Sequence, residues 1–300
     1  MRIHFNGLAY FGKQLVDDLN AFTNEHQFVF YDTYASRVDK LKFAYSINKA
    51  DKFVSFNGVS SKSGALDMVV SRKKPLIMYW HGTDVMKVLE AQNNGGMVKD
   101  YIDAATHYTD ARWLKDELAQ AGIAAEYLPF KYVTDKYDHI HYDELHVLAY
   151  LGDGREDLYG YDLILEAARN LPQRRFTIVG STGKGLERSE NISFMGWVSP
   201  EEMHELRTTH AIFLRCTKHD GNALSVLEGL AAGQEVIWTY PGEHCHHFTN
   251  DLTNKIKEVR ALIEDRENTP NLGNRKWVYE NHGKEAILKN FIDTITSEKK

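Results

Sequence analysis

The chain has 300 residues, of which 43% are hydrophobic and 26% are charged, as in ordinary globular proteins. This length accommodates two domains, and a net charge of −6 argues against a broad nucleic-acid-binding surface. Two cysteines, Cys216 and Cys245, are too few for a disulfide framework. The opening MRIHFNG lacks the apolar core of a signal peptide, and no apolar run approaches the ~18 residues that span a bilayer. We therefore expect a cytoplasmic protein and leave open a peripheral contact with the inner face of a membrane.

In the first half of the chain, short runs typical of β-strands alternate with helical patterns. The expected strands are RIHFN, QFVFYD, KFVSFN, PLIMYWH, THYTD and AEYLPF. Helical patterns lie between them, at 9–24, 36–50, 61–71 and 111–122. Alternation of this kind indicates βαβ units and a parallel sheet.

The alternation is interrupted at residues 131–145, which have no clear period and many charges, and we interpret this segment as a linker. Strand patterns then return as HVLAYLG, RFTIVG, ISFMG, AIFLRC and EVIWTY. A helix is expected over 161–171. Another begins at Ser199 and Pro200, with Glu202 completing a capping box.

The pattern predicts an α/β protein with two tandem Rossmann-like domains, each a doubly wound parallel sheet, at 1–140 and 141–280. The remainder, 281–300, contains a last helix at about 282–297, and we leave open that it packs back on the first domain. Ligands of such sheets bind beyond the carboxyl ends of the strands. Polar stretches follow strands in both halves, namely NG, HGTD, GDGRED, GSTGKG and HDGNA. They predict one cleft between the two domains.

The stretch HDGNALSVLEGLAAG, residues 219–233, places a carboxylate, Glu228, in a helix that is apolar almost all round. A buried carboxylate is costly unless it is hydrogen-bonded or paired, so a polar group must meet it. Two interpretations stay open: Glu228 binds vicinal hydroxyls such as a ribose diol, or it bonds to a neighbouring backbone or basic group. The turn at Gly221 and Asn222 opens the helix with free N–H groups that favour an anion.

The longer segment LRCTKHDGNALSVLEGLAAGQEVIWT resembles the signature of retaining, family 4-type glycosyltransferases of the GT-B fold. The resemblance implies that Glu228 binds the ribose of a nucleotide-sugar donor and that Asp220 faces the transferred sugar. It also implies that the N–H groups of Gly221, Asn222 and Ala223 reach the sugar or the phosphates. The family more often has Glu in the first acidic position, so Asp220 is a departure.

Other stretches extend the resemblance over nearly the whole chain. YLGDGREDLYGYDLILEAA is similar to the family's strand, basic loop and helix, where an Arg and a Lys neutralise the diphosphate leaving group. Arg155 is present here, but Tyr159 stands at the position of the Lys and cannot supply its charge. We expect Arg155, the helix N-terminus near Tyr161 or Lys184 to compensate for the missing lysine charge. The alternative for Arg155 is a surface ion pair with one of the two acidic residues that follow it.

Three more segments match in order. ENISFMGWVSPEEM resembles the segment whose backbone around Trp197 and Val198 contacts the base; the alternative is a loop with an aromatic ring packed under it. PLIMYWHGTD resembles the strand whose His, here His81, reaches the transferred sugar; the alternative is a structural histidine. HFNGLAYFGK occupies the place of a glycine-rich acceptor and phosphate loop, with Gly7 and Gly12 spaced more loosely than usual.

Rival motifs fit less well. VGSTGKG lacks the spacing of a P-loop, and neither first strand is followed by G-x-G-x-x-G. PGEHCHHFTND contains metal-ligand residue types, but adjacent residues cannot all point at one ion. We expect no metal site there.

We therefore predict a hexosyltransferase of polysaccharide biosynthesis that uses a nucleotide-sugar donor, such as a UDP- or GDP-sugar, and a glycan or glycolipid acceptor. The resemblance implies retention of configuration. We expect no metal or other cofactor, because fixed charges and dipoles stabilise the leaving group. The alternatives are a non-catalytic GT-B subunit that binds sugar or a partner, and a nucleotide-sugar epimerase. The sequence leaves the base, the sugar, the linkage and the oligomeric state open. The expected catalytic residues are Asp220, His81 and Arg155, and the expected donor-binding residues are Glu228, Gly221, Asn222, Ala223, Leu224, Trp197, Val198, Gly12 and Lys184.

Overall fold

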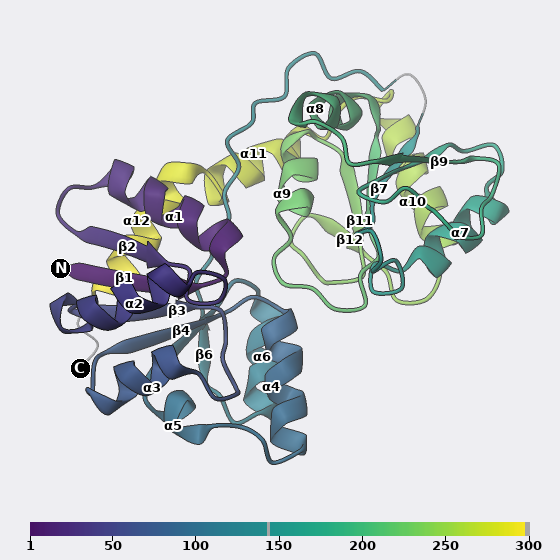
Figure 1. Ribbon diagram of the computed structural model, residues 1–300. Coiled ribbons are helices and arrows are strands. Elements are labelled where there is room, and N and C mark those ends of the chain that lie inside the picture. Colours follow the sequence, from purple (N-terminus) through teal and green to yellow (C-terminus); the bar gives the residue numbers. More distant parts are fainter. Residues whose placement is uncertain (143–144, 298–300) are drawn as a thin grey trace. The chain divides into compact units, whose positions relative to one another are not determined.

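The computed structural model of the chain describes residues 1–142 and 145–297 (Figure 1). It divides into two compact units, each built around one parallel six-stranded sheet. The first unit comprises Met1–Lys131 and the residues from Lys284 onward, and the second comprises Tyr132–Gly283. Helix α12 (Lys284–Thr296) therefore belongs to the first unit, where it contacts α1 (Ala9–Phe22). The Lys284 ammonium lies 2.5 Å from the Asp18 carboxylate on α1.

The sheet of the first unit has the order β2-β1-β3-β4-β5-β6, and every pairing in it is parallel. Its strands match the six expected from the sequence: β1 (Arg2–Gly7), β2 (Gln27–Tyr31), β3 (Lys52–Phe56), β4 (Leu76–Trp80), β5 (Ala105–Thr109) and β6 (Ala125–Tyr127). The other helical segments are α2 (Arg37–Ser46), η1 (Ile47–Lys49), α3 (Gly64–Ser71), α4 (Thr83–Asn93), α5 (Lys99–Asp103) and α6 (Arg112–Gln120). All five residues of β4, LIMYW, are buried, because helices cover both faces of a parallel sheet.

The sheet of the second unit is also parallel, with the order β12-β11-β10-β7-β8-β9. Its strands are β7 (Val147–Tyr150), β8 (Phe176–Val179), β9 (Ile192–Gly196), β10 (Ile212–Arg215), β11 (Glu235–Trp238) and β12 (Cys245–His247). Its helices are α7 (Tyr161–Asn170), α8 (Pro200–Thr209), α9 (Leu224–Ala231), α10 (Leu252–Asp265) and α11 (Leu272–Asn281). The predicted capping box at α8 is confirmed, because Ser199 and Glu202 bond reciprocally to each other's backbone N–H. The two-sheet α/β architecture is the one predicted.

The segment interpreted as a linker has a different role over residues 132–142, which belong to the second unit; residues 143 and 144 lie outside the described part of the chain. Tyr137 is 1% exposed, and its carbonyl accepts a hydrogen bond from Arg275 at 2.6 Å. The Asp135 carbonyl accepts another from the Tyr279 hydroxyl at 2.7 Å. These contacts with α11 hold the segment, although its sequence has no regular period.

The prediction of a glycine-rich loop after the first strand is wrong at Gly12, because this residue lies inside α1. A Cβ atom at Gly12 would come within 2.6 Å of the Phe30 ring, so glycine permits close packing of the helix on the sheet. The connection from β1 to α1 is the single residue Leu8.

Each sheet has a point where the strand order reverses: between β1 and β3 in the first unit, and between β7 and β10 in the second. Crevices outside the carboxyl ends of the strands at such points are the usual ligand sites of doubly wound sheets. In the second unit, the loops that meet there are 151–160 and 216–223.

Candidate active site

The polar group that meets Glu228 is Arg207, from the last turn of α8. Arg207 Nη2 donates to Glu228 Oε2 at 2.6 Å, and Nη1 donates to the Ser225 carbonyl at 3.2 Å. The Arg207 side chain is 2% exposed and that of Glu228 is 29% exposed. Within the described chain, Glu228 Oε1 accepts no hydrogen bond. One carboxylate oxygen is therefore fixed by a buried cation, and the other is available at the surface of the unit.

Asp220, eight residues earlier in the loop after β10, is held by a second arginine. Its Oδ2 accepts a hydrogen bond from Arg215 Nε at 2.7 Å and another from the Thr217 hydroxyl at 3.0 Å. Burial lowers the pKa of Arg215, but the charge of Asp220 and its hydrogen bond outweigh that effect and raise the pKa, so the guanidinium stays charged. Its two terminal nitrogens donate to no group among the described residues.

Tyr159, at the position where the resemblance implied a lysine, supports this arginine. The Arg215 guanidinium lies 5.0 Å from the centroid of the Tyr159 ring and 5.7 Å from that of Tyr150. Such cation–π contacts fix the position of a guanidinium on aromatic faces. Arg215 therefore brings a positive charge to the tyrosine that replaces the lysine.

The loops after β7 and β10 pack tightly against each other. Gly160 has φ +69°, and a Cβ atom there would meet the Cys216 carbonyl oxygen at 2.2 Å, so only glycine fits. The Lys218 N–H donates to the Leu158 carbonyl at 2.8 Å, and the Lys218 ammonium pairs with Asp157. The structure thus brings the loops that carry Arg155, Tyr159 and Asp220 to the reversal point of one sheet.

Arg155 and Lys184 are both exposed, and neither makes an ion pair within the part of the chain that the structure describes. The acidic residues next to Arg155 are otherwise engaged: Glu156 accepts from the Gly154 N–H at 3.0 Å and Asp157 pairs with Lys218. The surface ion pair considered for Arg155 does not form.

The turn before α9 leaves backbone donors available. The N–H groups of Gly221, Ala223 and Leu224 donate to no group among the described residues, and the helix has no side-chain cap. Asn222 is 9% exposed and makes further contacts. These donors lie beside Asp220 in the chain, at the positive end of the helix dipole.

Trp197 and Val198 follow β9 at the same edge of the sheet. The Trp197 side chain is 81% exposed, so the alternative of a ring packed under the loop is wrong. Val198 is half-buried.

His81 lies in the first unit, at the end of β4. Its ring contacts those of Phe56, Phe130 and Tyr79, with centroids 4.5, 5.2 and 5.0 Å away. Burial and the nearby Lys131 ammonium lower the pKa of His81 to about 3, and the Phe56 carbonyl only partly opposes this. The imidazole is therefore neutral near pH 7. Both ring nitrogens are buried and lack a hydrogen-bond partner among the described residues.

The last residue of the HGTD motif, Asp84, organises the turn that carries His81. Its carboxylate accepts from the N–H groups of His81 and Gly82 at 3.0 and 2.8 Å and from that of Gly58 at 2.6 Å. The sequence analysis gave Asp84 no role. A carboxylate in the first turn of the helix that follows Gly82 was the available signal.

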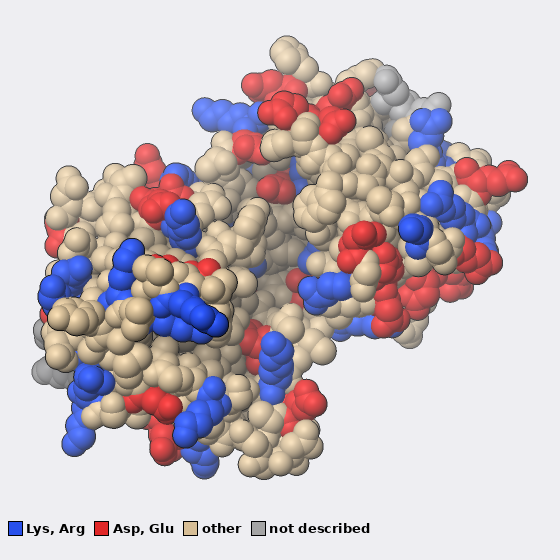
Figure 2. Space-filling model, viewed as in Figure 1, with Lys and Arg blue, Asp and Glu red and all other residues tan. Residues whose placement is uncertain are grey.

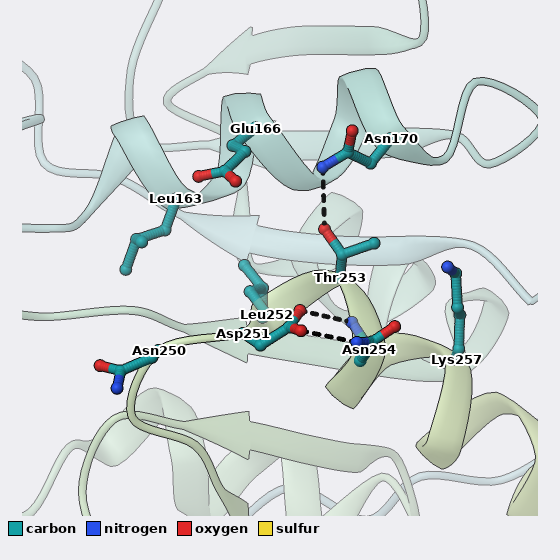
Figure 3. A pocket seen from close by; sticks show the side chains of 9 residues that line it. All are labelled: Leu163, Glu166, Asn170, Asn250, Asp251, Leu252, Thr253, Asn254 and Lys257. Atoms are coloured by element: carbon teal, nitrogen blue, oxygen red, sulfur yellow. Dashed lines mark hydrogen bonds between the residues drawn. The ribbon is translucent and has the colours of Figure 1, made fainter.

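A hollow between α7 and the start of α10 is not part of this site (Figure 3). Its polar groups mostly satisfy one another: Asp251 caps α10 through the Asn254 N–H, and Asn170 donates to the Thr253 hydroxyl. They stabilise the beginning of a helix.

Over the described residues, no group of His, Cys, Asp and Glu is arranged to hold a metal ion. No described helix is long and apolar enough to cross a membrane. In the histidine-rich loop, His246 pairs with Glu235 at 2.7 Å and His244 stacks on Trp277. The viewed face of each unit carries charges of both signs (Figure 2).

Residues 146–266, most of the second unit, match the family model described as Glycosyl transferases group 1. No curated protein sequence matches the chain. Among solved structures, the lipopolysaccharide outer core galactosyltransferase WaaB in its apo form has a TM-score of 0.65 at 14% identity, over 100% of both chains. Sucrose-phosphate synthase from Thermosynechococcus elongatus has a TM-score of 0.69 at 11% identity, over 98% of each chain. UDP-GlcNAc 2-epimerase from Neisseria meningitidis, bound to UDP-GlcNAc, has a TM-score of 0.55 at 13% identity, over 98% of this chain and 99% of its own.

The two parallel sheets and these neighbours define the GT-B fold. At such identities the neighbours show the fold alone, and the family match covers residues 146–266. The chain therefore has the GT-B fold, and most of its second unit is similar to the Glycosyl transferases group 1 family.

Proposed function

We propose that the protein transfers a hexose-type sugar, with retention, from a nucleotide-sugar donor bound at the carboxyl edge of the second sheet to a glycan or glycolipid acceptor. The observation that carries the proposal is the pair of arginine-held carboxylates, Glu228–Arg207 and Asp220–Arg215, around the start of α9. Both pairs belong to the matched family segment.

Glu228 is suited to the ribose of the donor. Arg207 fixes the orientation of the carboxylate, and the unbonded Oε1 can accept a hydrogen bond from a ribose hydroxyl. The ribose does not change during the reaction, so this contact contributes equally to the ground state and the transition state. Trp197, 81% exposed, offers a flat apolar surface to the base.

The diphosphate would be bound by fixed charge and backbone donors. Arg215 presents two terminal nitrogens without partners on a buried, charged group, and Arg155 is exposed and unpaired among the described residues. The N–H groups of Gly221, Ala223 and Leu224 add donors at a helix N-terminus. These groups stabilise the negative charge that develops on the leaving group as the glycosidic bond breaks.

Asp220 would face the transferred sugar, which acquires positive character as the leaving group departs. Arg215 and Thr217 both bond Oδ2 and set the direction of the carboxylate. In the related enzymes the leaving phosphate accepts the acceptor proton, and we propose the same here. Asp220 then acts by electrostatics, and Asp220→Asn should lower kcat with little change in nucleoside diphosphate affinity.

An assay with candidate UDP- and GDP-sugars tests the transferase assignment. A transferase releases nucleoside diphosphate and the unchanged sugar, and gives a product of retained anomeric configuration when acceptor is present. An epimerase yields the epimeric sugar, and a binding subunit yields no product. The metal-free scheme predicts that turnover persists in excess EDTA. Complete loss in EDTA that Mn²⁺ restores would contradict that scheme.

A further inference from the structure

The first unit contains a pocket of 740 Å³ that has no role in the donor site. It lies beyond the carboxyl ends of β2 and β3, between loop 57–63 and the residues that follow β2. The strand order reverses nearby, between β1 and β3, and doubly wound sheets bind ligands at such edges. The position alone makes the pocket a candidate ligand site.

The charged side chains that line this pocket are all lysines. Lys40 comes from α2, Lys62 from the loop before α3 and Lys87 from α4, and the lining includes no Asp or Glu. None of the three lysines makes an ion pair among the described residues. Three separate elements thus contribute lysines without acidic partners to the lining of one hollow.

Two acidic groups near the pocket bond to the backbone. Asp84 accepts hydrogen bonds from four backbone N–H groups, including that of Gly58 in the pocket wall. Asp32 Oδ1 accepts from the Tyr34 and Ala35 N–H groups at 3.2 and 2.9 Å. These carboxylates are therefore not partners of the pocket lysines.

Neutral donors accompany the lysines. Ser60 is 8% exposed, and its hydroxyl makes no hydrogen bond with the described residues although it lines the pocket. Ser61 and Ser63 line the same wall, and Ser63 precedes α3 without capping it. The unbonded Ser60 oxygen retains accessible surface, so it is available to a polar ligand in the pocket.

We propose that this pocket binds a phosphate group carried by the acceptor. Three lysines, an unbonded hydroxyl in the pocket wall and a helix N-terminus suit a dianion with many acceptor oxygens better than a neutral sugar. The inference rests on the proposed function, which places the donor in the second unit. It narrows the acceptor to a phosphorylated sugar or a sugar-phosphate lipid headgroup.

Calorimetric titration of the full chain with glucose 6-phosphate and with glucose, in the presence of saturating UDP, tests this proposal. We expect glucose 6-phosphate to bind and glucose not to. Lys62→Gln and Lys87→Gln should each weaken glucose 6-phosphate about tenfold, the loss of one charged hydrogen bond. Lys115→Gln on α6, an exposed lysine outside the pocket lining, is the matched control and should change nothing.

Three outcomes would overturn the proposal: no binding of glucose 6-phosphate beside bound UDP, equal weakening by Lys115→Gln, or glucuronate binding as tightly as glucose 6-phosphate. Saturating UDP keeps the probe out of the donor's own phosphate site. If UDP does not bind, GDP takes its place in the titration; if neither diphosphate binds, the proposed function fails instead, so the two failures are distinguishable. Vesicles containing phosphatidylinositol phosphate, compared with free glucose 6-phosphate, separate a lipid headgroup from a free sugar phosphate.

Discussion

The carboxyl edges of the two sheets differ in how their charged side chains are paired and buried. In the second unit, two carboxylates are held by two arginines of which one is 1% and the other 9% exposed. In the first unit, His81 is kept neutral by burial, Asp84 bonds only to backbone N–H groups, and the three pocket lysines are exposed, although Lys131 and Asp110 form a buried pair at 2.7 Å. Removing one partner of a buried ion pair leaves an uncompensated charge, at a cost of about 3–5 kcal/mol. The second edge is thus preorganised for one ligand geometry. At the first edge, the exposed lysines of the pocket are free to move.

The largest expected effect comes from removing the cation beside Tyr159. Arg215→Met should lower kcat about 100- to 1000-fold, because it removes charge stabilisation of the leaving group. Affinity for nucleoside diphosphate should fall far more than affinity for nucleoside, as calorimetry would show.

The double variant Arg215→Met/Asp220→Asn is the control for folding, because it removes both charges of the pair. Its melting temperature should exceed that of Arg215→Met, while its activity should stay low. Recovery of activity in the double variant would mean that Arg215 only compensates Asp220.

The next effect concerns the ribose contact. Glu228→Gln should raise the donor KM about tenfold to a hundredfold with little change in kcat, because a hydrogen bond to a charged group is lost equally in both states. The melting temperature should also fall, because Arg207 loses its buried counter-charge. A lower melting temperature with an unchanged donor KM would show that Glu228 is structural only.

A smaller effect is expected at Tyr159. From the sequence alone, Tyr159→Lys would be expected to restore the lysine charge that the resemblance implies and to keep or raise activity. The structure instead places the Arg215 guanidinium against the Tyr159 ring. A cation–π contact contributes about 0.5–2 kcal/mol, and a lysine would instead repel Arg215. Tyr159→Phe should leave the donor KM nearly unchanged and Tyr159→Lys should raise it. A lowered KM in Tyr159→Lys would contradict the role given to Arg215.

The smallest effect near neutral pH is that of the buried histidines. Burial lowers the pKa of His81 to about 3 and those of His4 and His210 to about 4. The histidines of the unfolded state titrate near 6.5, so between pH 6.5 and 4 the folded state binds fewer protons than the unfolded state. The contribution of these neutral histidines to the free energy of unfolding is therefore complete above pH 6.5 and is lost as the pH falls towards 4. Urea midpoints should be similar at pH 8 and 7 and lower at pH 5. Protonation of His81 between pH 5 and 8, seen by NMR, would contradict its burial.

The sequence predicted the fold well because the relevant signals are local. Eleven of the strands that the structure has are short apolar runs bounded by turns, and a parallel sheet follows from their alternation with helices. Strand β12, CHH, has no such run, and Gly12 was assigned to a loop because the glycine's contact with Phe30 is not visible in the chain.

The candidate site was predicted only in part. Asp220, Glu228 and Arg155 stand out by motif, but their partners Arg207 and Arg215 do not. Arg207 lies 21 residues before Glu228 on another helix, so the pairing depends on how α8 and α9 pack. Arg215 is the last residue of the buried strand IFLR. From the sequence alone, an arginine at the end of an apolar strand gives no indication that it binds a ligand.

Binding of UDP, GDP and their nucleosides to the wild-type chain and to Glu228→Gln, measured by calorimetry, tests the central claim that the second unit binds a nucleotide-sugar donor. The account predicts that one diphosphate binds the wild type, that the corresponding nucleoside binds more weakly, and that Glu228→Gln weakens both by about tenfold to a hundredfold. A wild-type chain that binds neither diphosphate, or a Glu228→Gln variant that binds as tightly as the wild type, would contradict it.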